Sequence, residues 1–267
     1  LMNVIAGPDP LDSTCWQKPA PDFLAGLKDG VNGMRVGVPK EYFVEGIDPE
    51  VEAAVRAAIQ QYESLGASIV DISLPTTPYA VATYYICATA EASSNLARYD
   101  GAHYGLRVEA DNIIDMFART RAQGFGNEVK RRIMLGTYAL SAGFYDAFYL
   151  KALKARTLYM REFEAAFQQC AFIACPTRPT PAFKFGDKVS DPLQMYLNDI
   201  FTIPCNLAGL PGISLPCGFS SGNLPIGLQL LAPAFEDAKM LRAAWAYEQA
   251  AGMQKVMPQS AIWRGDC

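Results

Sequence analysis

Two mainly apolar runs, at residues 212–219 and 226–232, stand close together in the C-terminal part of the chain. A polar cluster at 220–223 separates them, which predicts a β-hairpin with a longer loop. Neither run alternates between apolar and polar residues, as a strand with one exposed face would. We therefore expect both strands to lie deep in a sheet that has helices on each face. Periodicity alone favours an ordinary core hairpin and names no chemistry.

A second pattern, at 34–74, predicts a β-α-β unit. A short apolar strand at 34–38 is ended by Pro39, and a second strand is expected at 68–74. Between them Asp48 can cap a helix that has Pro49 at its first position and that Gly66 closes. The apolar stripe of this helix consists of Val51, Val55, Ile59, Tyr62 and Leu65. A crossover of this length allows parallel pairing and indicates an α/β fold.

Helical periodicity and breakers assign most of the remaining chain. A buried strand is expected at 171–175, where Pro176 ends it. The expected helices lie at 79–97, 112–122, 127–140, 144–167 and 237–251, with another that starts at Pro192 after the capping residue Asp191. The whole pattern predicts an α/β fold, with a sheet covered by helices.

The first residues resemble the end of a helix, because the apolar stretch 1–6 is followed by Gly7 and Pro8. We therefore expect 1–33 to be the end of a preceding core and a connecting segment rich in proline and glycine. Residues 34–267 would form the main domain, as the C-terminal part of a larger protein.

Composition excludes several classes of protein. The net charge of −4 and the pI near 5.1 argue against direct electrostatic binding of nucleic acid by this chain. No apolar run has the roughly 20 residues that a membrane helix needs, and no signal peptide is recognised. The seven cysteines include no Cys-x-x-Cys pair, which favours reduced thiols in a cytoplasmic protein over a disulfide framework or a metal site. The single histidine, His103, lies in a glycine-bearing turn and is interpreted as an ordinary loop residue.

Three polar residues in apolar surroundings are candidates for binding chemistry. Arg132 carries a two-pronged guanidinium that suits a carboxylate, and we expect Gly136, one turn later, to leave room beside it for a small ligand. Asp199 stands in an otherwise apolar run and needs a cation, which could be a ligand ammonium or another side chain. Tyr84 or its neighbour Tyr85 could present a hydroxyl to the same ligand.

Each candidate also has a purely structural explanation. Glu128 is placed for an i,i+4 pair with Arg132, and helix arginines are more often solvated than catalytic. The pair Ser93 and Ser94 has no glycine-rich turn or nearby lysine, so small serines on a packed helix face explain it better than a nucleophile does.

Several longer motifs resemble the amidase signature family, and within it the glutaminase branch of the tRNA-dependent amidotransferases. The most specific are EVKRRIMLGTYALS within 124–152 and MYLNDIFT at 195–202. The others are DPLDST (9–14), GVPKEYF (37–43), EASSNLARYDG (91–101), NLAGLPGISLPCG (206–218) and PIGLQLL (225–231).

The resemblance implies an α/β fold of the amidase-signature type, a mixed β-sheet flanked by helices, of which this chain would be an incomplete C-terminal portion. It also implies a function that composition and spacing do not reveal. It implies hydrolysis of glutamine to glutamate and ammonia, which a B subunit would use with ATP and Mg²⁺ to amidate Glu-tRNA(Gln) or Asp-tRNA(Asn). The implied partners are the B and C subunits and glutamine, with tRNA reached through the complex and no membrane. No cofactor is expected in this chain itself.

The resemblance also implies which residues bind substrate. Arg132 would hold the α-carboxylate of glutamine, Asp199 its α-ammonium, and Tyr84 would line the site. No catalytic residue is assigned, because the family's nucleophilic serine, cis-serine and lysine belong to a Gly/Ser-rich signature that these 267 residues lack. The alternatives are a fragment of another amide hydrolase of the family, and a non-catalytic binding or scaffold half.

Overall fold

The computed structural model describes residues 1–43, 46–184 and 197–253. The chain divides into two compact units. The sheet unit comprises Leu1–Pro78 and Tyr159–Cys267, and the helical unit comprises Tyr79–Leu158.

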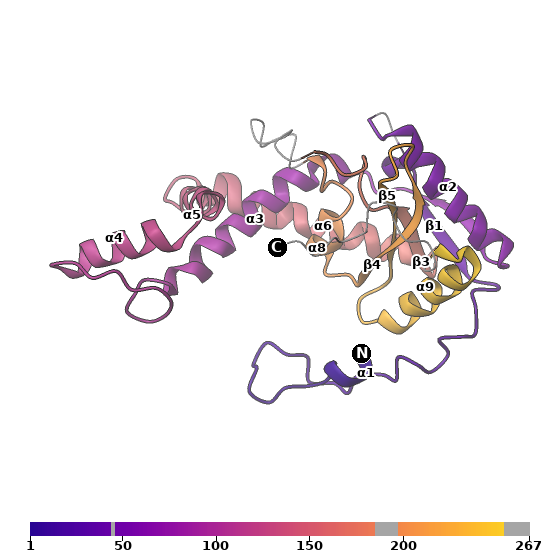
Figure 1. Cartoon of the computed structure of the whole chain (residues 1–267), viewed down its shortest axis with the longest axis horizontal. Coiled ribbons are helices and arrows are strands. Elements are labelled where there is room, and N and C mark those ends of the chain that lie inside the picture. The colour runs from indigo at the N-terminus through magenta and orange to yellow at the C-terminus, as the bar shows by residue number, and fades with distance from the viewer. Residues whose placement is uncertain (44–45, 185–196, 254–267) are drawn as a thin grey trace, which may run out of the picture. The chain divides into compact units, whose positions relative to one another are not determined.

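The sheet unit is built on five strands in the order β2-β1-β3-β5-β4. Figure 1 labels β1, β3, β4 and β5. Strands β1, β2 and β3 run parallel, whereas β5 is antiparallel to both of its neighbours. The strands span Arg35–Pro39 (β1), Ser68–Ile72 (β2), Phe172–Pro176 (β3), Gly212–Phe219 (β4) and Pro225–Leu231 (β5). The expected mixed sheet flanked by helices is therefore confirmed.

One face of the sheet is covered by α2 (Pro49–Ser64) and α9 (Asp237–Ala251), which pack on the strands and on each other. Asp48 caps α2 as expected, since its carboxylate accepts a hydrogen bond from the amide of Glu50 at 2.8 Å. Tyr62 of α2 is fully buried and its hydroxyl donates to the carbonyl of Ala243 in α9 at 3.0 Å. This bond joins the two helices over the sheet.

The opposite face carries a second apolar cluster. Phe163, near the end of α6 (Lys151–Phe167), packs there with Tyr42, Ile173 and Phe201. The ring of Tyr42 stacks on that of Phe201 at 4.9 Å between centroids. Both faces of the central strand β3 are consequently covered, and all five of its residues are buried.

The hairpin expected from its apolar runs is present as β4 and β5, but only β5 lies inside the sheet. Of the strands that the structure describes, β4 lies at one edge of the sheet and β2 at the other. Residues 212–217 of β4 alternate between exposed and half-buried. The expectation that both strands are deeply buried is wrong for β4. The small and apolar residues of β4 do not alternate with polar ones in the sequence. Its burial depends on which strands lie beside it, and the sequence pattern does not reveal that.

The helical unit contains three main helices, α3 (Ala80–Asn95), α4 (Ile113–Gly124) and α5 (Asn127–Ala139). Residues Tyr145–Leu150, expected as ordinary α-helix, form a π-helical segment that leads into α6. The remaining short helices are α1 (Met2–Ile5), α8 (Ile203–Ala208) and 3₁₀ turns at Lys40–Tyr42, Thr77–Tyr79 and Leu96–Arg98.

The expected helix end at the N-terminus is present as α1, but Gly7 does not terminate it in the left-handed conformation. The cap is Ala6, whose backbone is extended at φ −88° and ψ 133°. The helix start expected at Asp191 and Pro192 lies outside the described residues.

Candidate functional site

The carboxyl end of β3 leads into a stiff polar segment. Residues 177–181 contain Pro179 and Pro181 and directly follow Pro176, and proline fixes its own backbone and restricts the residue before it. The amide of Thr177 donates to the carbonyl of Gly227 at 3.0 Å. The carbonyl of Pro179 accepts from the amide of Asp48 at 2.8 Å. The segment is thus tied both to β5 and to the start of α2.

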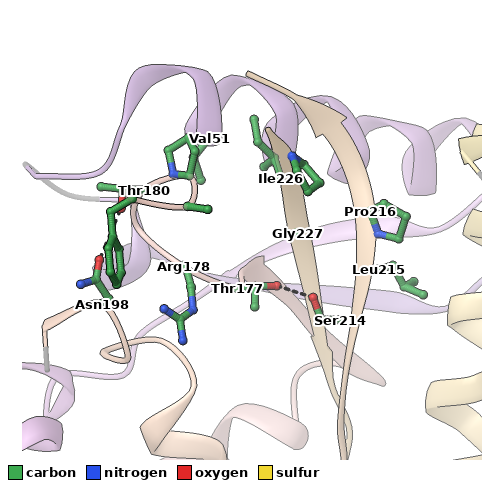
Figure 2. Close-up of a pocket in the computed structure, with 14 residues that line it drawn as sticks. Val51, Thr177, Arg178, Thr180, Asn198, Ser214, Leu215, Pro216, Ile226 and Gly227 are labelled. Atoms are coloured by element: carbon green, nitrogen blue, oxygen red, sulfur yellow. Dashed lines mark hydrogen bonds between the residues drawn. The ribbon is translucent and has the colours of Figure 1, made fainter. Parts of the chain in front are cut away.

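A hydroxyl pair crosses from this segment to β4. The Oγ1 of Thr177 and the Oγ of Ser214 are 2.8 Å apart, as the dashed line in Figure 2 shows. Gly227 makes room for the pair, because a Cβ at this position would lie 2.7 Å from Thr177 Oγ1 and 2.9 Å from Ser214 Oγ. The glycine is therefore explained by close approach of these hydroxyls.

A cavity of about 710 Å³ opens beside the hydroxyl pair. Its wall is mostly apolar, with polar groups from Thr177, Arg178, Thr180, Asn198 and Ser214 (Figure 2). A concave apolar pocket with a few convergent polar groups, at the carboxyl end of a strand, has the features of a small-molecule site.

Asp199 follows Asn198, which lines this cavity, and its carboxylate pairs with a cation from the same chain. Its Oδ1 lies 3.0 Å from a terminal nitrogen of Arg178. Its carbonyl accepts from the amides of Thr202 at 3.0 Å and Ile203 at 2.9 Å, where α8 begins. The buried side chain of Gln229 donates to the carbonyl of Phe201 at 2.9 Å and so fixes this turn to β5. The need for a cation beside Asp199, expected from the sequence, is met by Arg178.

Arg132 lies on α5 in the helical unit. Its Nε donates to Glu128 at 2.9 Å, as the i,i+4 spacing predicts, and its guanidinium carbon is 5.5 Å from the centre of the Tyr85 ring. Burial acts to lower the pKa of Arg132, but the Glu128 hydrogen bond and the nearby Tyr85 and Tyr84 raise it above its usual value. Arg132 is therefore a fixed positive charge whose nearest aromatic neighbours include both candidate tyrosines.

Gly136 does not leave room for a ligand, contrary to our expectation. A Cβ there would lie 1.9 Å from the carbonyl oxygen of Thr89 and 2.9 Å from Ser93 Cβ. The glycine instead allows α5 to cross close to the backbone of α3. The same contact supports the interpretation of Ser93 as a small residue on a packed face.

The candidates fall into two groups. Arg132, Tyr84 and Tyr85 belong to the helical unit, and Asp199 belongs to the sheet unit. Thr177, Arg178 and Ser214 were missed by sequence reasoning. Polar residues placed directly after a buried strand that ends in proline were the available signal, since ligands gather at the carboxyl ends of strands.

The histidine and the buried cysteines of the chain are poor candidates for catalytic groups. His103 is an exposed loop residue whose Nδ1 pairs with Asp100 at 2.7 Å. Burial raises the pKa of the Cys175 thiol to about 12 and that of Cys205 to about 11, so neither is a nucleophile at neutral pH. The described residues contain no group of three or more metal-binding side chains. No helix among them is long and apolar enough to cross a membrane.

Comparison with known proteins places the chain beside two curated relatives. It is 61% identical over 250 residues to the A subunit of glutamyl-tRNA(Gln) amidotransferase from Myxococcus xanthus, covering 93% of this chain and 51% of the relative. It is 59% identical over 251 residues to the protein of the same name from Geobacter metallireducens, covering 94% and 52%. The chain thus spans about half the length of the curated relatives it matches.

Two crystal structures share its fold. The A subunit of glutamyl-tRNA(Gln) amidotransferase from Thermotoga maritima matches with a TM-score of 0.73 at 41% identity, over 93% of this chain and 49% of that one. A bacterial aryl acylamidase also gives a TM-score of 0.73, over 95% and 50%, but at 20% identity it supports the fold alone. The Amidase family model matches residues 1–241. Because this match covers most of the chain, the chain belongs to the amidase family.

Proposed function

We propose that this chain is the C-terminal part of the glutaminase subunit of a tRNA-dependent amidotransferase. The observation that carries the proposal is the 61% identity over 93% of the chain to the glutamyl-tRNA(Gln) amidotransferase protein of Myxococcus xanthus. The complete subunit would hydrolyse glutamine and supply ammonia for converting Glu-tRNA(Gln) to Gln-tRNA(Gln), or Asp-tRNA(Asn) to Asn-tRNA(Asn).

In this proposal the chain supplies the groups that recognise glutamine. Arg132 binds the α-carboxylate, because its guanidinium keeps its charge and offers paired donors. Asp199 binds the α-ammonium, because a carboxylate attracts a positively charged group. Tyr84, near Arg132, lines the site.

The reaction itself is assigned to the part of the subunit that precedes these residues. The nucleophilic serine, the cis-serine and the lysine of the family belong to a Gly/Ser-rich signature that is absent from this sequence. The 267 residues alone are consequently expected to be inactive. The ammonia passes to a B subunit that uses ATP and Mg²⁺, in a cytoplasmic complex with a C subunit, and tRNA is bound through that complex.

The test compares the glutaminase activity of this chain alone with that of the full-length subunit that contains it. We expect none from the chain alone and release of glutamate and ammonia from the full-length form. In the full-length form, Arg132→Ala and Asp199→Ala each remove a charged hydrogen bond to substrate, so kcat/KM should fall about ten- to hundredfold.

Arg131→Ala is the matched control, because Arg131 is also an α5 arginine that pairs with Glu128 but has no assigned role. It should leave kcat/KM within about twofold, as expected for an exposed ion pair. Activity of the 267 residues alone would place the nucleophile within them and overturn the division of roles. Full activity of both Arg132→Ala and Asp199→Ala would overturn the assignment of these two residues to glutamine binding.

A further inference from the structure

Arg178 differs from an ordinary surface arginine in how firmly it is held. It sits between Thr177, which is bonded to β4 and β5, and Pro179, whose carbonyl is bonded to Asp48. A residue that precedes proline is restricted to extended backbone conformations. The backbone of Arg178 is therefore held in place where its guanidinium reaches the Asp199 carboxylate.

The ion pair also has a position that matters for binding. Arg178 lines the cavity of about 710 Å³ (Figure 2), and its terminal nitrogen is 3.0 Å from Asp199 Oδ1. A cationic group that approached this carboxylate would meet the positive charge of Arg178 at short range. Like charges at such distances repel, and a carboxylate already paired attracts a second cation less strongly.

We propose that Arg178 is a specificity-determining residue that competes with the substrate ammonium for Asp199 and so weakens binding of the α-amino end of glutamine. This inference rests on the proposed function, which assigns the ammonium to Asp199. Arg178 sets the affinity for glutamine without touching the reacting amide. Its removal therefore tightens binding and leaves the chemical step unchanged.

The size of the effect follows from exposure. The side chains of Arg178 and Asp199 are 52% and 36% exposed, so solvent screens the pair. Partly exposed ion pairs of this kind typically correspond to about 1.4- to 5-fold in an equilibrium constant. We expect Arg178→Gln to lower KM for glutamine by about two- to fivefold, with kcat unchanged.

The experiment uses the full-length protein and two amides. Glutamine carries the α-ammonium, and glutaramate is the same molecule without its amino group. Arg178→Gln should raise kcat/KM for glutamine about two- to fivefold and leave that for glutaramate unchanged. Arg178→Met repeats the measurement with an apolar side chain, and Arg178→Lys, which keeps the charge, should stay within about twofold of the parent protein.

Arg56→Gln is the matched control. Arg56 has the same 52% side-chain exposure and pairs with Glu52 at 2.7 Å on α2, but it does not line the cavity. Its substitution should change neither substrate's kcat/KM. In an Asp199→Asn background, Arg178→Gln should also have no effect, because the shared carboxylate is gone.

Three outcomes would overturn the inference. An unchanged or raised KM for glutamine in both Arg178→Gln and Arg178→Met would show that the arginine does not compete. An equal gain with glutaramate would show that Arg178 acts through the general shape of the cavity. If Asp199→Asn itself leaves the KM for glutamine unchanged, the assignment of the ammonium in the proposed function fails as well, which separates the two failures.

Discussion

The sheet unit and the helical unit achieve their internal contacts with different side chains. The core of the sheet unit is made of large residues that are fully buried, among them Tyr62, Phe163, Phe172 and Leu230. In the helical unit the buried residues are mostly small, such as Ala80, Thr89 and Ala139. One unit excludes water with bulky side chains, and the other brings helix backbones close together.

The exposed residues of the helical unit complete the contrast. Large apolar side chains on α4, α5 and the π-helical segment are exposed, including Ile114, Met134, Tyr138 and Phe148. Burial of apolar area is the main favourable term in folding. The sheet unit therefore carries most of the internal stability, whereas the helical unit depends on one close helix crossing.

The largest effect is expected from emptying the core of the sheet unit. Phe172 is fully buried on β3 and its ring contacts that of Tyr62 edge to face at 5.2 Å. Phe172→Ala should lower the free energy of unfolding by about 3–5 kcal/mol, because it leaves a cavity that packed neighbours cannot fill. Hydrogen exchange followed by mass spectrometry should show faster exchange throughout β1, β3 and β5. Exchange that changes only in α3 and α5 would contradict the separation of the two units.

Gly136→Ala is the corresponding change in the helical unit. The new methyl group would collide with the backbone of Thr89, and a backbone cannot move aside as a side chain can. We expect a loss of about 1–3 kcal/mol or more, seen as faster exchange in α3 and α5.

Gly124→Ala is its control, since it is also a helical glycine but its Cβ would meet only Leu106 at 3.7 Å. This substitution should be neutral or stabilising by up to about 1 kcal/mol. If Gly136→Ala behaved like Gly124→Ala, the close crossing would not be what holds the helical unit together.

The buried thiol of Cys175 should make the stability of the sheet unit depend on pH. Burial raises the pKa of Cys175 to about 12, whereas a thiol in an unfolded chain titrates near ~8.5. The folded state therefore keeps this proton more tightly, so the stabilisation is complete below pH ~8.5 and is lost as pH rises toward 12. The contribution changes by up to about 1.4 kcal/mol per pH unit in that window.

Urea unfolding midpoints between pH 8 and pH 10, measured with a reducing agent present, test this expectation. The sheet unit should lose stability as pH rises, and Cys175→Ala should make that dependence shallower. A pH dependence that Cys175→Ala leaves unaltered would mean that this thiol does not titrate with unfolding of the sheet unit.

Local patterns predicted much of the fold. The capping aspartate, the proline after it and the apolar stripe of α2 are local signals, and the structure confirms them. Pro176, which ends β3, and the polar turn between β4 and β5 are also local signals, and both lie where the sequence predicted them. The position of β4 could not be predicted, because edge and centre depend on which strand a distant part of the chain places alongside.

The candidate site divides in the same way. The pairing of Arg132 with Glu128 follows from helix spacing within one element. The cation beside Asp199 could not be identified, since Arg178 comes from the end of β3 and meets Asp199 only when β5 and Gln229 hold the turn in place. Gly136 was misinterpreted because the sequence shows a missing side chain but not the neighbouring helix that requires it.

By itself the sequence determined the type and place of most elements, the family resemblance and the residue types able to bind an amino acid. These properties depend on interactions between residues a few positions apart or on motifs read directly. The tertiary structure alone decided that Thr177 meets Ser214, that Arg178 neutralises Asp199 and that α3 and α5 approach at Gly136. Such contacts join residues from different elements, and their geometry is set by packing of the whole chain.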